Sequence, residues 1–235
     1  MSMLRSASTP TASSDAGGPL VQIALDVTTT EVAVDLAEAA LAAGADRLEI
    51  GKPLVEFVGL TRSASIVAAF PQVWFELDLM IMAGATRYVR AAADMGAHGV
   101  TVTGLAPRRT IEDAVTAGRE YDVLVTVDLF NVEDPVGAAR TAVDLGAEAL
   151  MVHVGVDQRR HESQFSQIAV LREIVGNTSV PVSYAAYDVT EAVAAVTAGA
   201  SVVVMGDPLI SADDPETALR EFIREVGSAR RGLTA

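Results

Sequence analysis

The chain has 235 residues, of which half are hydrophobic and 5% aromatic, a composition that suits helices packed on a buried sheet in one large domain. The formal net charge of −14 is spread along the chain, which argues against nucleic acid as a partner, and no apolar run is long enough to span a bilayer. The sequence contains no cysteine, so disulfides and thiolate metal sites are excluded.

Residues 1–18 are rich in Ser, Thr, Ala and Gly and lack the continuous apolar core of a signal peptide. A segment of this composition buries too little apolar surface to fold by itself. We therefore predict a disordered tail over residues 1–18 of a cytoplasmic protein, followed by one folded domain over residues 19–235.

Eight short runs rich in β-branched residues follow the tail, and an Ala-rich stretch with helical spacing comes after each of them. The runs cover residues 21–26, 47–50, 73–77, 99–103, 123–127, 149–154, 180–184 and 201–205. A Gly-Ala pair, suited to end a helix, precedes every second run at intervals of about 50 residues. Eight such β-α units predict an α/β fold, a single (β/α)8 TIM barrel. A doubly wound open sheet is the alternative, but no glycine-rich dinucleotide-binding loop follows the first run.

In such a barrel the chemistry lies where the strands end and the following loops begin. Asp26, Glu49 and Asp78 end three consecutive runs, so we expect these carboxylates to meet at one rim. Oxygen ligands of this kind suit Mg²⁺, or Mn²⁺ in its place, although each acid alone could instead cap the following helix. Further candidates lie at the ends of the later runs: Thr103, Asp128, Asn131, His153, Asp157, Tyr184, Gly206 and Asp207.

Lys52 is the only lysine among 17 basic residues. It follows Glu49 by three positions at the predicted rim, which indicates a need for a titratable or nucleophilic amine. The alternative is a surface lysine without a catalytic role. Two arginine pairs, at positions 108–109 and 159–160, are candidates for contact with an anionic substrate, although arginines are also common on protein surfaces.

A more specific resemblance is carried by the segments VQIALD, DRLEIGKPL, DLMIMAG, VDLFNV and MVHVGVDQ. In order and spacing they are similar to the family of 3-hexulose-6-phosphate synthase and 3-keto-L-gulonate-6-phosphate decarboxylase, in the orotidine-5′-phosphate decarboxylase suprafamily. The resemblance implies that Glu49 and Asp78 bind Mg²⁺ and that His153 performs acid–base chemistry near an enediolate. Asp26 takes the place of the aspartate that ends the family's first strand.

The chain also departs from this family. In the third-strand signature D-x-K-x-x-D, Met80 replaces the lysine and Ala83 replaces the final acid. The family holds a substrate phosphate with backbone N–H groups of glycine pairs after the seventh and eighth strands. The corresponding positions here are Ala185, Ala186, Gly206 and Asp207. An aspartate close to a dianion costs on the order of 1 kcal/mol or more even in wet surroundings, so the usual phosphate contact is not expected.

These features favour a divergent lyase or isomerase that forms a metal-stabilised enediolate from a small carbonyl substrate, without the usual phosphate anchor. The predicted catalytic residues are Lys52, His153 and Asp26, and the predicted metal ligands are Glu49 and Asp78. The predicted substrate-binding residues are Asp128, Asn131, Asp157, Tyr184, Ala185, Ala186, Gly206 and Asp207.

Two alternatives stay open. One is a 3-hexulose-6-phosphate synthase or 3-keto-L-gulonate-6-phosphate decarboxylase with rewired phosphate contacts, and the other is a non-catalytic binding protein on the same barrel. The resemblance, together with an Ala-rich and weakly charged segment after Ala83, further predicts a homodimer with its sites near the subunit interface.

Overall fold

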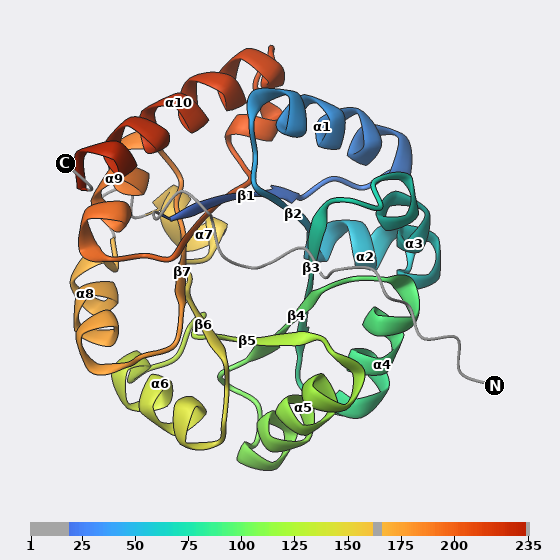
Figure 1. The fold of residues 1–235 in the computed structure, drawn as a ribbon, viewed down its shortest axis with the longest axis vertical. Helices are drawn as coiled ribbons and strands as arrows, with labels where there is room; N and C mark the ends of the chain where they lie inside the picture. Colours follow the sequence, from blue (N-terminus) through green and yellow to red (C-terminus); the bar gives the residue numbers. More distant parts are fainter. Residues whose placement is uncertain (1–18, 162–165, 234–235) are drawn as a thin grey trace.

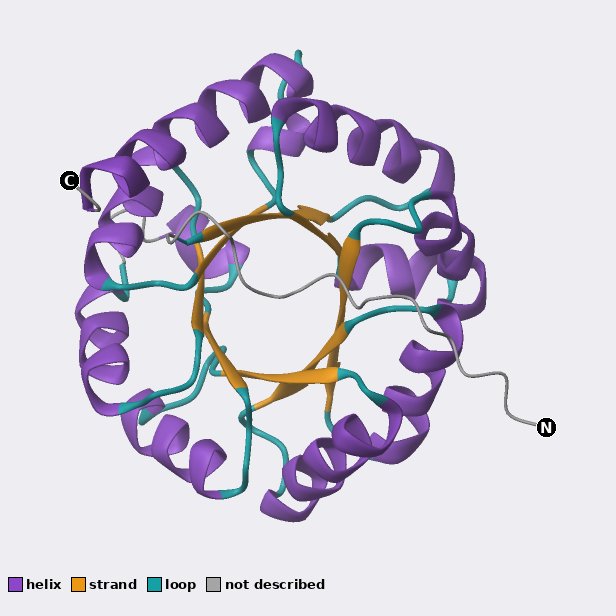
Figure 2. Ribbon diagram, in the orientation of Figure 1, coloured by secondary structure: helices purple, strands orange, loops and turns teal. Residues whose placement is uncertain are grey.

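A computed structural model describes residues 19–161 and 166–233. The tail predicted over residues 1–18 lies outside the described residues, as do residues 162–165 and 234–235. Eight parallel strands form a closed barrel in which each strand pairs with its neighbours in chain order and β8 pairs with β1 (Figure 1). Figure 2 shows these strands as an inner ring with the helices outside it. The predicted (β/α)8 barrel is therefore confirmed.

The strands are β1 Leu20–Leu25, β2 Arg47–Ile50, β3 Trp74–Ile81, β4 Gly99–Thr103, β5 Leu124–Asp128, β6 Ala149–Val152, β7 Val182–Ala185 and β8 Val202–Met205. The helices are α1 Thr30–Ala43, α2 Lys52–Val58, α3 Leu60–Ala69, α4 Ala85–Met95, α5 Arg108–Tyr121, α6 Pro135–Asp144, α7 Val156–His161, α8 Ile168–Asn177, α9 Val189–Ala198 and α10 Pro215–Leu233. A short 3-10 helix, η1 Leu209–Ser211, lies between β8 and α10.

Strand β3 differs most from its prediction, because it continues past the predicted end at Leu77 to Ile81. Leu77 lies opposite Val100 of β4, and regular pairing resumes with Ile81 opposite Val102. The segment between them holds more residues than β4 can pair with, so the strand bulges at the point where the third-strand signature lies. The other predicted strands differ from the observed ones by at most two residues at either end.

The Gly-Ala pairs end helices as predicted. Gly44 follows α1 with a φ of 102°, and the backbone N–H groups of Gly44 and Ala45 donate to carbonyls in the last turn of the helix. Glycines 96, 146 and 199 take the same left-handed conformation. A residue with a Cβ would be strained there, so glycine allows each of these helices to stop and the chain to turn into the next strand.

The interior of the barrel has an apolar part and a polar part. Leu20, Ala24, Met151, Val202 and Val204 form a separate apolar cluster. Most buried polar side chains of the strands come from β1 to β5, with one from β7: Gln22, Arg47, Glu49, Glu76, Thr101, Thr103, Thr126, Asp128 and Ser183. Because alternate residues of a strand face opposite sides, each strand contributes every second residue to this interior and the others to the contact with the helices.

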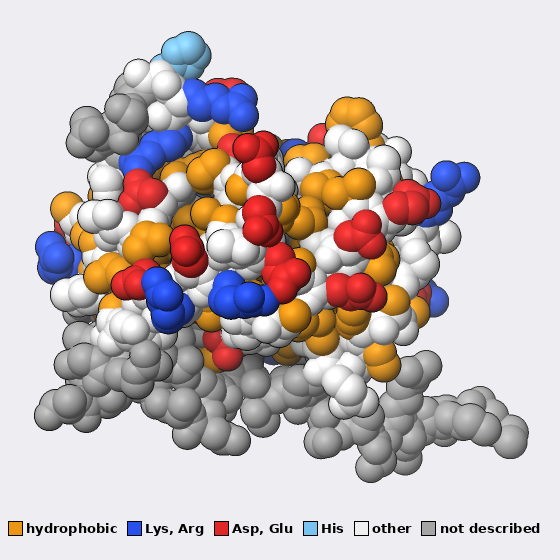
Figure 3. Space-filling view, turned by 90° about the horizontal axis from the view of Figure 1, so that it is seen from above, with side chains coloured by type: hydrophobic (Ala, Val, Ile, Leu, Met, Phe, Trp, Pro, Cys, Tyr) orange, Lys and Arg blue, Asp and Glu red, His pale blue; other side chains and the backbone are white. Residues whose placement is uncertain are grey.

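The helices and the face drawn in Figure 3 show how apolar and charged side chains are distributed. No helix within the described ranges is long and apolar enough to cross a membrane. On the face drawn in Figure 3, acidic and basic side chains are interspersed among hydrophobic ones, without a continuous basic patch. This face therefore offers no extended site for the phosphates of a nucleic acid.

Candidate active site

A cavity of about 570 Å³ opens at the carboxyl ends of the strands. Most residues predicted for the site line it: Asp26, Glu49, Lys52, Asp78, Asp128, His153, Asp157, Ala185, Ala186, Gly206 and Asp207. These residues are far apart in the sequence and are brought together because parallel strands in a barrel end at the same rim. Met80 and Arg160, both noted in the sequence, also line the cavity, as do Phe130, Tyr187 and Ser211, which the sequence did not indicate.

Asp128 and His153 form a dyad at this rim. His153 Nδ1 lies 2.9 Å from Asp128 Oδ2, and the other carboxylate oxygen of Asp128 accepts the backbone N–H of Phe130 at 2.9 Å. Burial by itself would lower the pKa of His153. The charge of Asp128, its hydrogen bond and the charges of Asp78 and Asp26 outweigh that effect and raise the pKa to about 9. His153 is therefore an imidazolium at neutral pH, held through Nδ1.

Glu49 and Asp78 are two carboxylates that burial makes reluctant to ionise. Glu49 accepts a hydrogen bond from Gln22 Nε2 at 2.6 Å, but burial and the charges of Asp78, Glu76 and Asp26 hold its pKa well above the usual range. Burial, followed by the charge of Asp128, raises the pKa of Asp78 to about 6. Mutual repulsion of this kind is what a bound cation relieves.

Asp78 and Met80 are linked through Thr101 of β4. Thr101 Oγ1 donates to Asp78 Oδ1 at 2.7 Å and accepts the backbone N–H of Met80 at 2.8 Å. Met80 has a φ of 40°, a conformation that a residue other than glycine seldom takes. The bulge of β3 therefore places the carboxylate of Asp78 and the thioether of Met80 together at the cavity, where the family signature has an acid and a lysine.

Asp26 lies in a slot between two glycines. A Cβ on Gly51 would lie 2.1 Å from Asp26 Oδ1, and a Cβ on Gly206 would lie 2.6 Å from Asp26 Oδ2. Glycine at both positions is therefore required by the carboxylate. Asp26 is open to the cavity, yet desolvation by the surrounding protein raises its pKa; the charge of His153 opposes this increase and that of Asp207 adds to it.

Lys52 begins α2 at the edge of the cavity. Its Nζ lies 2.5 Å from Glu56 Oε1 on the next turn of the same helix, and both side chains are partly exposed. The predicted position of Lys52 at the rim is thus observed, and Glu56 is its ion-pair partner.

Tyr184 and Asn131 do not line the cavity, in contrast to their predicted role in substrate binding. Tyr184 is fully buried on the outer side of β7, where its hydroxyl donates to Glu191 Oε1 at 2.7 Å. Its neighbour Ala185 is the residue that faces the cavity, as the alternation along a strand requires. Asn131 is an exposed turn residue with a φ of 56°, so its side chain serves the turn after β5.

After β7, the first of the two expected phosphate positions, backbone N–H groups have acceptors within the chain. The N–H of Ala186 donates to the carbonyl of Val204 at 2.9 Å. The N–H of Tyr187 donates to Glu191 Oε2 at 3.1 Å, and that of Glu191 donates to Asp188 Oδ1 at 2.8 Å. Carboxylates of the protein thus occupy the start of α9, where a phosphate would otherwise find donors.

A closed (β/α)8 barrel with an Asp-His dyad and further carboxylates at its mouth defines the class of the protein: a TIM barrel whose ionisable side chains gather where its strands end. The family follows from sequence comparison. A sequence model of the Orotidine 5'-phosphate decarboxylase / HUMPS family matches residues 19–222, and the chain belongs to this family.

Relatives within this family agree with the resemblance. The chain is 32% identical to the 3-hexulose-6-phosphate synthase of Methylomonas aminofaciens over 205 residues, which cover 86% of this chain and 97% of the relative. A solved structure of a 3-hexulose-6-phosphate synthase, 30% identical, superposes with a TM-score of 0.80 over 90% of this chain and 99% of the other. The chain spans about half the length of relatives named Bifunctional enzyme Fae/Hps, from Methanospirillum hungatei and Methanothrix thermoacetophila.

Proposed function

We propose that this protein is a divergent lyase or isomerase that forms an enediolate from a carbonyl substrate without a phosphate group. The observation that carries the proposal is the composition of the cavity. It retains Asp26, Glu49, Asp78 and His153 of the family's acid–base and metal positions, but has Met80 in place of the lysine. Of the positions expected to hold a phosphate, the one after β7 has its Ala186 N–H already bonded within the chain, and the one after β8 carries the negative charge of Asp207.

The chemistry begins with removal of a proton from a hydroxyl-bearing carbon next to the carbonyl. Asp26 is our candidate for the base, since its raised pKa makes it a stronger base than an ordinary carboxylate. The C–H electron pair becomes a C=C bond, and the carbonyl oxygen gains the displaced pair. His153, protonated and oriented by Asp128, is our candidate to donate a hydrogen bond to that oxygen.

We further propose that Glu49 and Asp78 hold Mg²⁺ or Mn²⁺. Their repulsion and their oxygen donors fit a hard divalent cation, which often binds through one or two carboxylates and keeps several waters. Among the described residues, no group of three or more His, Cys, Asp or Glu side chains is arranged to bind a metal, so the remaining ligands would be water or substrate oxygens. When bound, such an ion supplies positive charge beside the developing oxyanion.

The second candidate is a 3-hexulose-6-phosphate synthase with rewired phosphate contacts, which the identity of about 30% to proteins of that name favours. The two candidates differ in the substrate that they accept. Removal of formaldehyde from a 3-hexulose 6-phosphate leaves ribulose 5-phosphate, so ribulose and ribulose 5-phosphate form a matched pair of probes.

The test is proton exchange in D₂O, followed by NMR with each probe, with and without Mg²⁺. Our proposal predicts Mg²⁺-dependent exchange into ribulose and little into ribulose 5-phosphate. The reverse preference would establish the second candidate, and no exchange into either sugar or into other small hydroxyketones would refute both. Titration calorimetry should also show weaker Mg²⁺ binding by Asp78→Asn than by Asp113→Asn, an exposed control.

A further inference from the structure

The helix α7 carries an arginine pair whose two side chains lie in different environments. In Figure 1 α7 lies inside the outer ring of helices, next to β6 and β7. Adjacent residues of a helix point about 100° apart, so the two arginines have different neighbours. Arg160 lines the cavity and is 66% exposed, whereas only 15% of the Arg159 side chain is exposed.

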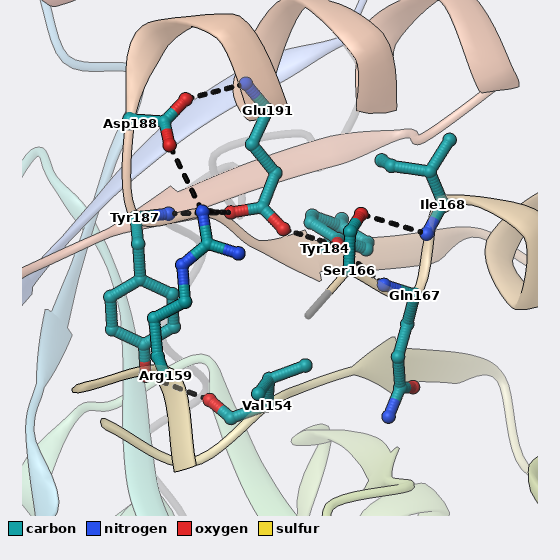
Figure 4. A network of polar contacts seen from close by, with 9 residues as sticks. All are labelled: Val154, Arg159, Ser166, Gln167, Ile168, Tyr184, Tyr187, Asp188 and Glu191. Atoms are coloured by element: carbon teal, nitrogen blue, oxygen red, sulfur yellow. Dashed lines mark hydrogen bonds and ion pairs between the residues drawn. The ribbon is translucent and has the colours of Figure 1, made fainter. Parts of the chain in front are cut away.

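Arg159 ties α7 to the start of α9 (Figure 4). Its guanidinium lies 3.0 Å from Asp188 Oδ2 and 3.3 Å from Glu191 Oε2, and it lies over the ring of Tyr187. The Tyr187 hydroxyl donates to the carbonyl of Val154, just before α7, at 2.7 Å. These contacts hold the short helix from two directions and therefore define where the next side chain, Arg160, points.

Arg160 has a weak partner. One of its terminal nitrogens lies 3.9 Å from Asp207 Oδ2, at the outer limit of an ion pair, and both side chains reach solvent. Asp207 Oδ1 already accepts a hydrogen bond from Ser211 Oγ at 2.7 Å. The guanidinium therefore has donors to offer, and an incoming anion displaces only a solvent-screened contact.

The surroundings of Arg160 favour an anion of one charge over a dianion. Asp207 and Asp26 both line the cavity, and they lie close enough for the charge of Asp207 to raise the pKa of Asp26. A phosphate dianion would face this repulsion twice over and would find the amides of Ala186 and Tyr187 occupied. A carboxylate carries one charge and matches the planar fork of a guanidinium in two parallel hydrogen bonds.

We propose that Arg160 is a substrate-binding residue that selects a carbonyl substrate bearing a carboxylate, with Arg159 as the residue that positions it. This inference rests on the proposed function, since it assigns a substrate class to the same cavity. It also separates the arginine pairs of the sequence: Arg109 is exposed and paired with Glu112 and Asp113 on α5, and it does not line the cavity.

The experiment compares three probes that share a hydroxyketone: hydroxypyruvate with a carboxylate, dihydroxyacetone without charge and dihydroxyacetone phosphate with a phosphate. Binding to the full chain is measured by ligand-observed NMR or calorimetry. We expect hydroxypyruvate to bind most tightly of the three. Arg160→Gln should weaken it about tenfold or more, the loss expected for a charged hydrogen bond, and leave dihydroxyacetone unchanged.

Two further variants give the comparison its controls. Asp207→Asn keeps an acceptor for Ser211 but removes the competing charge, so it should tighten hydroxypyruvate binding, whereas Arg109→Gln should have no effect. Circular dichroism confirms that each variant is folded. Equal binding of the three probes, or hydroxypyruvate binding that survives in Arg160→Gln, would overturn the inference.

The binding measurement tests the role of Arg160, and the proton-exchange measurement tests the proposed reaction, so either can be refuted without the other. If hydroxypyruvate binds through Arg160 but exchanges no proton in D₂O with Mg²⁺ present, the inference stands and the proposed reaction falls. If dihydroxyacetone and ribulose exchange protons while Arg160→Gln changes nothing, the reaction stands and the inference falls.

Discussion

The charge of His153 depends on the carboxylate that contacts it. Burial alone would leave the imidazole neutral, and the charge and hydrogen bond of Asp128 are the largest effects that reverse this. In this cavity Met80 lies where the family has a lysine, so the imidazolium is a positive charge that can take over part of that lysine's electrostatic role. The same residue would lose this role if Asp128 were neutral.

We predict that Asp128→Asn lowers the pKa of His153 from about 9, as measured by NMR titration of the histidine ring protons.

The raised pKa of His153 also stabilises the fold. The stabilisation by protonated His153 is fully present below pH 6.5, the ordinary pKa of histidine, and it is lost as the pH rises through about 9. The difference in unfolding free energy between the unmodified protein and Asp128→Asn should therefore shrink above pH 9. Asp134→Asn, at a helix cap, should leave the titration of His153 unchanged, and a pKa that stays near 9 in Asp128→Asn would contradict this account.

At the level of elements, one buried hydroxyl on β7 forms hydrogen bonds that connect this strand to α8 and α9. The hydroxyl of Tyr184 donates to Glu191 Oε1 at 2.7 Å and accepts the backbone N–H of Gln167 at 3.2 Å (Figure 4). Glu191 also binds Arg159 and the N–H of Tyr187, so the same carboxylate supports the position of α7. The tyrosine that the sequence assigned to substrate thus supports the scaffold behind the cavity.

Tyr184→Phe should reduce the unfolding free energy by about 1–2 kcal/mol, because it leaves a part-buried N–H and a buried carboxylate oxygen without this partner. Urea denaturation measures the change. Tyr121→Phe, at the end of α5, is a matched control outside this contact and should change stability little. Hydroxypyruvate should still bind in Tyr184→Phe. If Tyr184→Phe lost hydroxypyruvate binding but kept its stability, Tyr184 would be a substrate-binding residue after all.

At the level of the whole molecule, exposed hydrophobic side chains are concentrated on one flank of the mouth. Phe57, Met82, Tyr88 and Leu105 are exposed and come from consecutive units, from α2 through the loop after β4. In Figure 1 these units occupy adjacent positions around the barrel. Such a patch favours the homodimer that the resemblance implies, with the partner next to the cavity.

We predict that the protein sediments as a dimer and that the paired change Met82→Glu, Leu105→Glu shifts it to a monomer. A charge placed in an apolar contact loses its hydration without gaining a partner. Ala169→Glu, on an exposed position of α8 that lies across the barrel from these units in Figure 1, should leave the dimer intact. If the unmodified protein sediments as a monomer across the micromolar range, the predicted dimer is wrong.

Local sequence determined the barrel. Each β-α unit carries its own strand run and many carry a helix-ending glycine, such as Gly44, so the repeat could be recognised without knowing which units touch. The rim carboxylates and His153 could be placed for the same reason, because every parallel strand ends on one side.

Only the tertiary structure decided how these residues are used. The bulge of β3 depends on pairing with β4 and on Thr101, which lies 21 residues from Met80. The pKa of His153 depends on charges from other strands, and the different roles of Arg159 and Arg160 depend on the start of α9. Hydrogen bonds and charges act through space, between residues whose separation along the chain carries no mark of their contact, and this is why the sequence alone could list the candidates but not assign their partners.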